Sequence, residues 1–443
     1  VQYVQYEKHL PPPPPTCCFV KLLFYVGNLP SWLQGTLLRN GPGSMGCFWA
    51  FWYYWLHWLC EVIYRSRYLH GYTYFTDNCG NNFIRCGKDY YATSETNYIR
   101  KVDPVTLKTQ DKVDYLKYLA VNLVTSHPHY DKDGTAYNMG TSIAEKGKTK
   151  YTLFKVPDTT AGGTLPASPA LKNLEVICTV PCRSLLSPSY YHSFGMTDNL
   201  FIEQPFKLDI LKMATFFPEE NTLTDRKTGK EVGIKYYTEA MIVYHHVKAF
   251  EKDGHVIFDV IAYEDPSLYN MFYIDVLKEQ SKTSALSVPK CKRFALPVQT
   301  DMVMVSSAVK EKGGKLLCQP EVLCDGVELP RINYDFNGKY RFVYMTCVAM
   351  SAVATKVKLD NEAKERTEWR EENCWTSEPV FIPRPNGEGE DDGVVLTTVI
   401  NSNPGESGFI LVLDAKSFKE VARAYVNAEL HMDMHGYFIP KEN

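Results

Sequence analysis

Short runs of β-branched and apolar residues, separated by turn-forming stretches, are the feature that most restricts the fold of this chain. The clearest runs are EVICTV (175–180), HVIFDVIAY (255–263), DGVVLTTVI (392–400) and GFILVLDA (408–415). Polar breaks containing Gly or Pro lie between such runs: DKDG, RPNGEGEDDG and NPGESG. The only helical stretches we expect are short, for example 208–215 and 361–370. Many short strands with few helices predict an all-β sandwich, barrel or propeller, although no repeat period selects the propeller by pattern alone.

The composition indicates the cellular compartment of the protein and gives no support for a nucleic-acid partner. The 13 cysteines have irregular spacing and include no CxxC pair, which is typical of a reducing compartment such as the cytoplasm. The apolar segment 17–26 is short and follows five prolines, so we expect no signal peptide. A net charge of -3 gives no electrostatic argument for nucleic-acid binding, which needs a clustered basic face.

Two features of the first 64 residues bear on domain organisation and on membrane contact. The Pro11 to Pro15 tract suggests an irregular segment over 1–28, followed by one domain over 29–443. The run CFWAFWYYWLHWLCEVIY (47–64) contains Glu61 and is only 18 residues long, which is marginal for crossing a bilayer. Aromatic residues at this density suit an interfacial surface or a buried layer.

The histidines are the candidate metal ligands. Several lie beside strand-like runs: His127, His129, His192, His245, His246, His431 and His435. On a strand adjacent side chains point to opposite faces, so only one of His245 and His246 can face a given centre. The histidines do not lie in an HExxH motif, so the sequence does not support a zinc protease. A single histidine on a strand is usually structural, and imidazole ligands suit iron, copper, zinc and nickel alike. Ligands from separate strands leave no spacing signature, so the residues alone define no site.

A series of motifs in chain order resembles the carotenoid cleavage oxygenase family, from residue 29 to residue 438. These motifs are LPSWLQGTLLRNGPG (29–43), ATSETNYIRKVDP (92–104), SHPHYDKDGTAYNMG (126–140), SPSYYHSFG (187–195), VYHHVKAFEKDG (243–254), GVELPRINY (326–334), SEPVFIPRP (377–385), EDDGVVL (390–396), LDAKSFKEVARA (413–424) and MHGYF (434–438). The segments CRSLLSPSYYHSFG and LDILKMAT are most similar in sequence to the family members that cut beta-carotene centrally.

The resemblance implies a specific set of site residues. The resemblance maps the iron-binding histidines of the family onto His127, His192, His245 and His435, and the glutamates that hold those rings onto Glu95, Glu328 and Glu378. Four neutral imidazoles would hold Fe(II) and leave positions open for oxygen, while the glutamates would orient the rings. His129, His246 and His431 are expected to be structural. Tyr190 and Tyr263 match tyrosines that line the cleavage site, where they could stabilise a cationic polyene; the alternative is ordinary aromatic core.

The resemblance also implies a fold and a reaction. We expect a seven-bladed β-propeller, with iron on its axis and a helical or loop cap over one face. The expected reaction is cleavage of the central 15,15' double bond of beta-carotene by O2, giving two molecules of retinal. A carotenoid or retinoid would enter an apolar tunnel, with peripheral membrane contact for its uptake.

Departures from the family pattern leave alternatives open. The aromatic run 47–64 stands where the family has an HWFDG-like motif, and the chain looks shortened near residues 75, 216 and 302. Lys248 stands where the family has asparagine, and Met350 where the central-cleavage enzymes have an aromatic residue. Parts of blades would then be missing. The alternatives are eccentric carotenoid cleavage, retinoid isomerohydrolysis, and non-catalytic binding of a carotenoid or retinoid.

Overall fold

The structure is a computed structural model, and the chain divides into two compact units, Gln2–Phe75 and Thr76–Asn443. All described residues lie in the second unit. They are residues 77–440 without 146–147, 159–169, 183–188, 204–205, 208–219, 231–235, 240, 266, 269–286, 299–308, 313–314, 337–339, 349–352, 428–429 and 431–433. The expected boundary after residue 28 and the aromatic run 47–64 fall outside this part of the chain.

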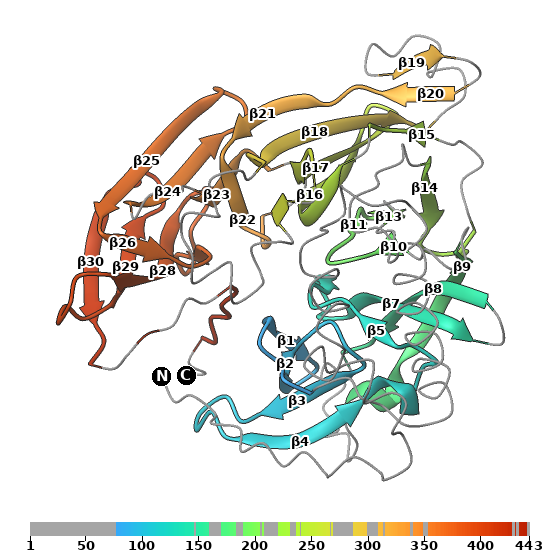
Figure 1. The fold of residues 1–443 in the computed structure, drawn as a ribbon, viewed down its shortest axis with the longest axis horizontal. Coiled ribbons are helices and arrows are strands. Elements are labelled where there is room, and N and C mark those ends of the chain that lie inside the picture. Colours follow the sequence, from blue (N-terminus) through green and yellow to red (C-terminus); the bar gives the residue numbers. More distant parts are fainter. Residues whose placement is uncertain are drawn as a thin grey trace, which may run out of the picture. The chain divides into compact units, whose positions relative to one another are not determined.

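The described residues form six mainly antiparallel sheets (Figure 1), which follow one another in chain order except that sheet 3 also takes in two strands from within the span of sheet 4. Sheet 1 contains β1 (Asn82–Cys86), β2 (Asp89–Thr93), β3 (Tyr98–Val102) and β4 (Thr109–Asp114). Sheet 2 contains β5 (Leu123–Val124), β6 (His129–Tyr130), β7 (Ala136–Glu145), β8 (Lys148–Val156) and β9 (Glu175–Pro181). Sheet 3 contains β11 (Gly195–Met196), β12 (Leu200–Glu203), β14 (Glu220–Asp225), β15 (Tyr236–Tyr237), β19 (Val309–Lys312) and β20 (Lys315–Cys318).

The second half of the chain supplies the other three sheets. Sheet 4 contains β16 (Ile242–Lys252), β17 (His255–Tyr263), β18 (Lys290–Pro297) and β21 (Glu321–Asp325). Sheet 5 contains β22 (Val327–Arg331), β23 (Phe342–Cys347), β24 (Val353–Asp360) and β25 (Glu365–Glu372). Sheet 6 contains β26 (Cys374–Thr376), β27 (Val380–Pro383), β28 (Gly393–Asn401), β29 (Phe409–Asp414) and β30 (Glu420–Tyr425). Strands β10 (Ser189–Tyr190) and β13 (Phe206–Lys207) pair with each other in a separate two-stranded sheet.

Strand β17 illustrates how the sequence builds these sheets. The two-residue turn before it places Asp253 at φ 49° and Gly254 at φ 69°, and Lys252 pairs with His255 across it. Asp-Gly with both φ values positive is the turn that matches the twist of a β-hairpin. Because side chains alternate along a strand, β17 serves two different cores. Val256, Phe258 and Val260 pack with side chains of sheet 3, and Ile261 and Tyr263 pack with side chains of sheet 5.

The same face-to-face packing joins each sheet to the next. Mixed apolar clusters connect sheet 1 with sheet 2, sheet 2 with sheet 3, and sheet 5 with sheet 6, in addition to the two clusters around sheet 4. Successive sheets that pack face on face in chain order are the blades of a β-propeller. The predicted all-β class is therefore confirmed.

The predicted number of seven blades is wrong for the described residues, which form six sheets and the pair β10–β13. One physical reason lies in β20. Tyr236 and Tyr237 of β15 pair in parallel with Leu316 and Leu317 of β20, so the β19–β20 hairpin widens sheet 3 and does not start a sheet of its own.

Helical elements are few in the part of the chain that the structure describes. They are the 3-10 helices η2 (Tyr115–Lys117) and η4 (Ala170–Asn173) and the helical residues 267–268. The helical or loop cap therefore stays a prediction. Among these residues no helix has the length and apolar character needed to cross a membrane.

One of the two expected helical stretches is a strand. Residues 361–364 form a turn in which Lys364 has φ 58°, and the remaining residues, 365–370, all belong to β25. The charges of β25 lie on the outermost strand of sheet 5, where Arg366 and Arg370 both bind Glu368. Charged residues suit a strand at a sheet edge, because they oppose pairing with other chains. The other stretch, 208–215, is outside the described residues.

Candidate metal centre

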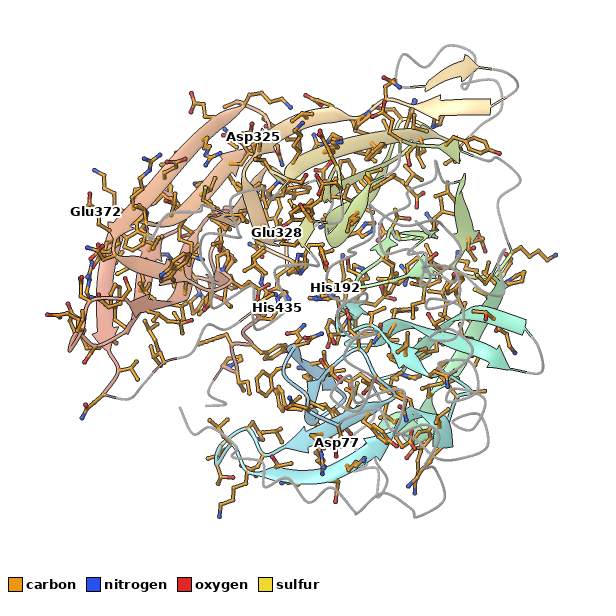
Figure 2. The ribbon with its side chains drawn as sticks, in the orientation of Figure 1. Asp77, His192, Asp325, Glu328, Glu372 and His435 are labelled. Atoms are coloured by element: carbon orange, nitrogen blue, oxygen red, sulfur yellow. The ribbon has the colours of Figure 1, made fainter. Side chains whose placement is uncertain are left out.

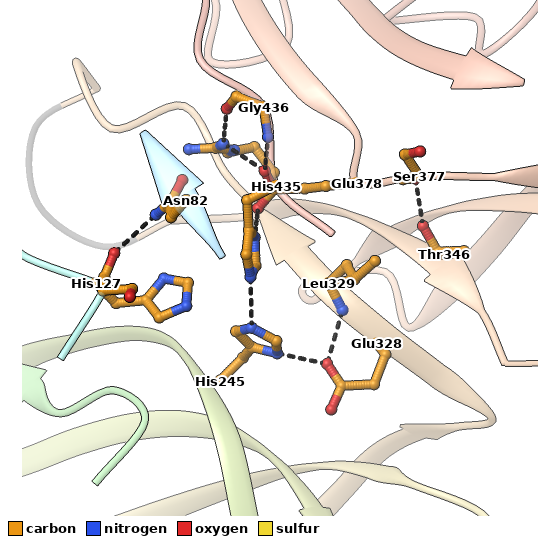
Figure 3. A network of polar contacts seen from close by, with 12 residues as sticks. Asn82, His127, His245, Glu328, Leu329, Thr346, Ser377, Glu378, His435 and Gly436 are labelled. Carbon is orange, nitrogen blue, oxygen red and sulfur yellow. Dashed lines mark hydrogen bonds and ion pairs between the residues drawn. The ribbon is translucent and has the colours of Figure 1, made fainter. Parts of the chain in front are cut away.

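Four histidine side chains from distant parts of the chain meet at one point. One ring nitrogen of each of His127, His192, His245 and His435 lies within 4.8 Å of the others. The Nε2 atom of His192 is 3.0 Å from that of His127 and 3.2 Å from that of His245, whose Nε2 is 3.3 Å from that of His435. Figure 2 shows His192 and His435 close together between the sheets, and Figure 3 shows His435 above His245.

Each histidine reaches this point from a different local structure. His127 lies between β5 and β6, His192 follows β10, His245 lies in β16, and His435 belongs to an irregular segment after β30. The pairing of β16 with β17 shifts register between Val243 and His246 and again between His246 and Lys248. Such bulges re-aim side chains and are frequent beside active sites.

The neighbouring histidines point elsewhere. His246 is half-buried, with its ring centroid 6.2 Å from that of Phe258. The Nε2 atom of His129 lies 2.6 Å from the carbonyl oxygen of Phe194, within hydrogen-bond distance. The structure therefore places both outside the cluster, and strand alternation accounts for the opposite directions of His245 and His246. His431 is outside the described residues.

Three carboxylates bind the far nitrogen of three of these rings. The Nδ1 atoms of His192, His245 and His435 lie 2.5 Å from Glu95 Oε1, 2.6 Å from Glu328 Oε2 and 3.1 Å from Glu378 Oε1. A proton on Nδ1 then donates to each carboxylate, and Nε2 is left with a lone pair that faces the centre. The structure brings together the seven residues that the family resemblance selected.

Burial sets the charge of the ligands. It lowers the pKa of His127 well below its ordinary value, and the other three histidines act in the same direction. Burial also lowers the pKa of His245, although the Glu328 carboxylate opposes the shift. Both groups are therefore neutral near pH 7, which is the form of imidazole that binds a metal.

The nitrogen positions fit a metal ion. His192, His245 and His435 carry their protons on Nδ1, so their Nε2 lone pairs face one another across separations of 3.2 and 3.3 Å and repel unless a cation lies among them. The Nε2 atom of His127 completes the cluster, 3.0 Å from that of His192. Two nitrogens bound at right angles to one metal, each at about 2.1 Å, are about 3.0 Å apart. The observed separations lie close to this value. Four imidazole nitrogens suit a transition metal such as iron, copper, zinc or nickel.

Comparison with known proteins decides the family. Residues 64–440 match the family model described as retinal pigment epithelial membrane protein. Beta,beta-carotene 15,15'-dioxygenase of Gallus gallus is 48% identical, over 94% of this chain and 95% of the relative. The Homo sapiens protein of that name is 46% identical, over 93% and 91%. This chain belongs to the carotenoid oxygenase family. The Homo sapiens mitochondrial carotenoid-cleaving dioxygenase is 33% identical, over 94% and 87%.

Solved structures agree with a carotenoid oxygenase fold. A Synechocystis apocarotenoid oxygenase variant superposes with a TM-score of 0.60 at 19% identity, over 81% of this chain and 74% of the other. Cobalt-substituted Synechocystis ACO gives a TM-score of 0.59 at 19% identity, with the same coverage. The alignment with the Gallus gallus relative has 500 positions, more than the 443 residues of this chain. Stretches of that relative therefore have no counterpart in this carotenoid oxygenase.

The sequence reasoning missed Arg331, which joins two parts of the site. Its Nη2 atom donates to Glu378 Oε2 at 2.8 Å and to the carbonyl oxygen of Gly436 at 3.1 Å. Burial alone would raise the pKa of Glu378, but Arg331 and the hydrogen bonds from His435 and Gly436 lower it to about 2. The GVELPRINY motif could have pointed to Arg331, because this arginine lies in it three residues after Glu328.

The structure describes the side chain of only one of the two tyrosines expected to line the substrate. Tyr263 ends β17, is 2% exposed, and packs edge-on against Tyr244 with 6.0 Å between ring centroids. Burial and the nearby Glu328 carboxylate raise its pKa. Tyr190 pairs with Phe206 in the β10–β13 ribbon, but its side chain is outside the described part of the structure.

Proposed function

We propose that this carotenoid oxygenase uses Fe(II) and O2 to cleave the central 15,15' double bond of beta-carotene, giving two molecules of retinal. The single observation that carries the proposal is the four-histidine, three-carboxylate centre. The relatives that are 46–48% identical and carry the name beta,beta-carotene 15,15'-dioxygenase support this choice of substrate.

The protein's own residues would prepare the metal and hold the substrate. His127, His192, His245 and His435 would bind iron through neutral imidazoles, and Glu95, Glu328 and Glu378 would hold three rings in the required tautomer. Bound Fe(II) would supply the redox chemistry by which O2 attacks an alkene. Tyr263 and Tyr190 are proposed to line the polyene, because an aromatic face stabilises nearby positive charge.

A long apolar substrate would be collected from a lipid surface. Several large side chains near the C-terminal segment are exposed: Tyr334, Phe336, Tyr437, Phe438 and Ile439. Exposed apolar groups of this kind support a peripheral contact with a membrane. We propose a cytosolic protein that makes this contact reversibly.

Metal content is the first test. Wild-type protein purified without added metal should contain close to one iron per chain, and His245→Ala should contain almost none. His129→Ala is the matched control, because it removes a half-buried histidine whose Nε2 atom lies within hydrogen-bond distance of a carbonyl oxygen and is not part of the cluster. The iron-loaded wild type should then convert beta-carotene to retinal. A folded wild type without iron, or equal loss of iron in both variants, would contradict the proposal.

One observation favours a second candidate. Because stretches of the Gallus gallus relative have no counterpart here and the described residues form six sheets where seven were expected, the chain could bind a carotenoid or retinoid without turning it over. Retained iron and tight pigment binding without consumption of O2 would identify this case. Eccentric cleavage or retinyl ester isomerisation would be recognised from the products.

A further inference from the structure

We propose that Lys356 is a positioning residue, which holds the segment before Glu378 and thereby fixes the orientation of His435. The inference rests on the proposed metal centre. Lys356 lies in β24, and its side chain is completely buried.

The amine of Lys356 is directed at the residue that precedes Glu378. Its Nζ atom donates to the carbonyl oxygen of Ser377 and, at 2.7 Å, to Thr346 Oγ1. The Ser377 carbonyl also accepts from Thr346 Oγ1 at 3.0 Å and from Thr397 Oγ1 at 3.1 Å. Figure 3 shows the Thr346–Ser377 bond beside Glu378 and His435. Three side chains thus hold one carbonyl, and the next residue along the chain is the carboxylate that binds His435.

The register of sheet 5 connects this contact to the second carboxylate. Glu328 of β22 is the direct partner of Thr346 in β23, and Thr346 is the direct partner of Lys356 in β24. One row across three strands therefore runs from Glu328, whose carboxylate binds His245, to Lys356, which binds Ser377. The positions of Glu328 and Glu378 relative to each other depend on this row.

A purely structural role does not account well for a lysine at this position. Burial lowers the pKa of Lys356 well below its ordinary value, and Glu378 is the charged group that opposes the shift. A buried amine has an unfavourable desolvation free energy, and an apolar side chain of similar volume often stabilises a core at least as well. The position of the amine beside Ser377 and Glu378 is consistent with a role at the site.

Lys358 offers a matched control on the same strand. It lies two residues further along β24, is 6% exposed, and donates from Nζ to Asp391 Oδ2 at 2.8 Å and to the Lys416 carbonyl at 2.9 Å. Replacing Lys358 therefore removes a buried, hydrogen-bonded amine that contacts neither Ser377 nor Glu378 in the described structure.

The test measures iron release from the full-length, iron-loaded protein into a colorimetric Fe(II) chelator. Lys356→Met should release iron about 10-fold faster or more, because loss of support for a ligand typically costs 10–100-fold in metal affinity. Lys358→Met should release iron at the wild-type rate, even where both variants lower the melting temperature. Thr346→Val, which removes one donor to Ser377 and one partner of Lys356, should show a smaller increase.

Each outcome decides the question. Equal release rates for wild type and Lys356→Met, or for the two lysine variants, would overturn the inference while leaving the proposed function intact. If Lys356→Met does not fold, Thr346→Val decides, and release at the wild-type rate would reject the role. Wild-type protein that holds no iron would reject the proposed function itself, and this inference with it.

Discussion

Glu328 and Glu378 perform the same task for their histidines in different electrostatic surroundings. Glu378 is paired with the guanidinium of Arg331, whereas Glu328 accepts the backbone N–H of Leu329 at 2.8 Å. Burial alone would raise the pKa of Glu328, but His245 and the hydrogen bond from the Leu329 N–H lower it overall. Its negative charge is therefore available to strengthen the electron donation of His245 to a metal.

Glu328→Gln should weaken iron binding. The amide oxygen can still accept the Nδ1 proton of His245, but the charge is lost, so we expect a 10–100-fold lower affinity in competition with a chelator. Glu390→Gln is the control, since the buried Glu390 carboxylate accepts backbone N–H groups of Arg341 and Phe342 and contacts no histidine of the centre. An unchanged affinity in Glu328→Gln would argue against the orienting role.

At the scale of single elements, the β24–β25 hairpin shows where sequence patterns mislead. The turn depends on Asp360, whose carboxylate accepts the backbone N–H groups of Glu362 and Ala363 and the guanidinium of Arg341. Arg341 and these backbone groups outweigh burial and lower the pKa of Asp360 to about 2. Side chain to backbone bonds of this type favour turns over helices, so a stretch with helix-forming residues became a hairpin.

Asp360 should make stability depend on pH. A carboxylate whose folded pKa is depressed stabilises the folded state above its unfolded pKa of about 3.9, and this contribution is lost as the pH falls toward about 2. Asp360→Asn should therefore lower the free energy of unfolding at pH 6 and by clearly less at pH 3. Urea unfolding at both pH values measures the difference. A pH-independent difference would show that the charge of Asp360 does not support the turn.

At the scale of the whole described unit, face-to-face packing between sheets determines stability, and one polar contact links two sheets. Asp259 of β17 is fully buried, binds Arg293 of β18 at 2.8 and 2.6 Å, and accepts the hydroxyl of Tyr340, which precedes β23 of sheet 5. A buried charge that loses its partner is costly, whereas apolar replacement of both charges is often tolerated.

Arg293→Met should lower the free energy of unfolding by about 3–5 kcal/mol, because Asp259 is left as a buried unpaired charge. The double variant with Asp259→Leu should recover part of this loss. The comparison is Arg384→Met, which removes the exposed pair with Asp392 and should change stability by less than about 1 kcal/mol. Denaturant titrations measure all three variants. Similar losses for the buried and exposed pairs would show that the network carries little of the stability.

The sequence by itself determined the local structure and the family. β17 spans the predicted run 255–263, and the Asp253–Gly254 turn has a local cause in the chemistry of two residues. The order of motifs selected the seven site residues by resemblance. The helix predicted over 361–370 did not form, and the described residues do not form seven blades, since charged edge strands and parallel pairing between distant strands have no local signature.

Only the tertiary structure brought the site together. His192 and His245 are 53 residues apart in the chain, and His245 and His435 are 190 apart, yet their Nε2 atoms lie 3.2 and 3.3 Å apart. No spacing rule connects such positions, because each side chain is placed by a different sheet or loop and by the packing between sheets. Arg331 and Lys356 became visible for the same reason: their partners are distant in sequence and adjacent only in the folded chain.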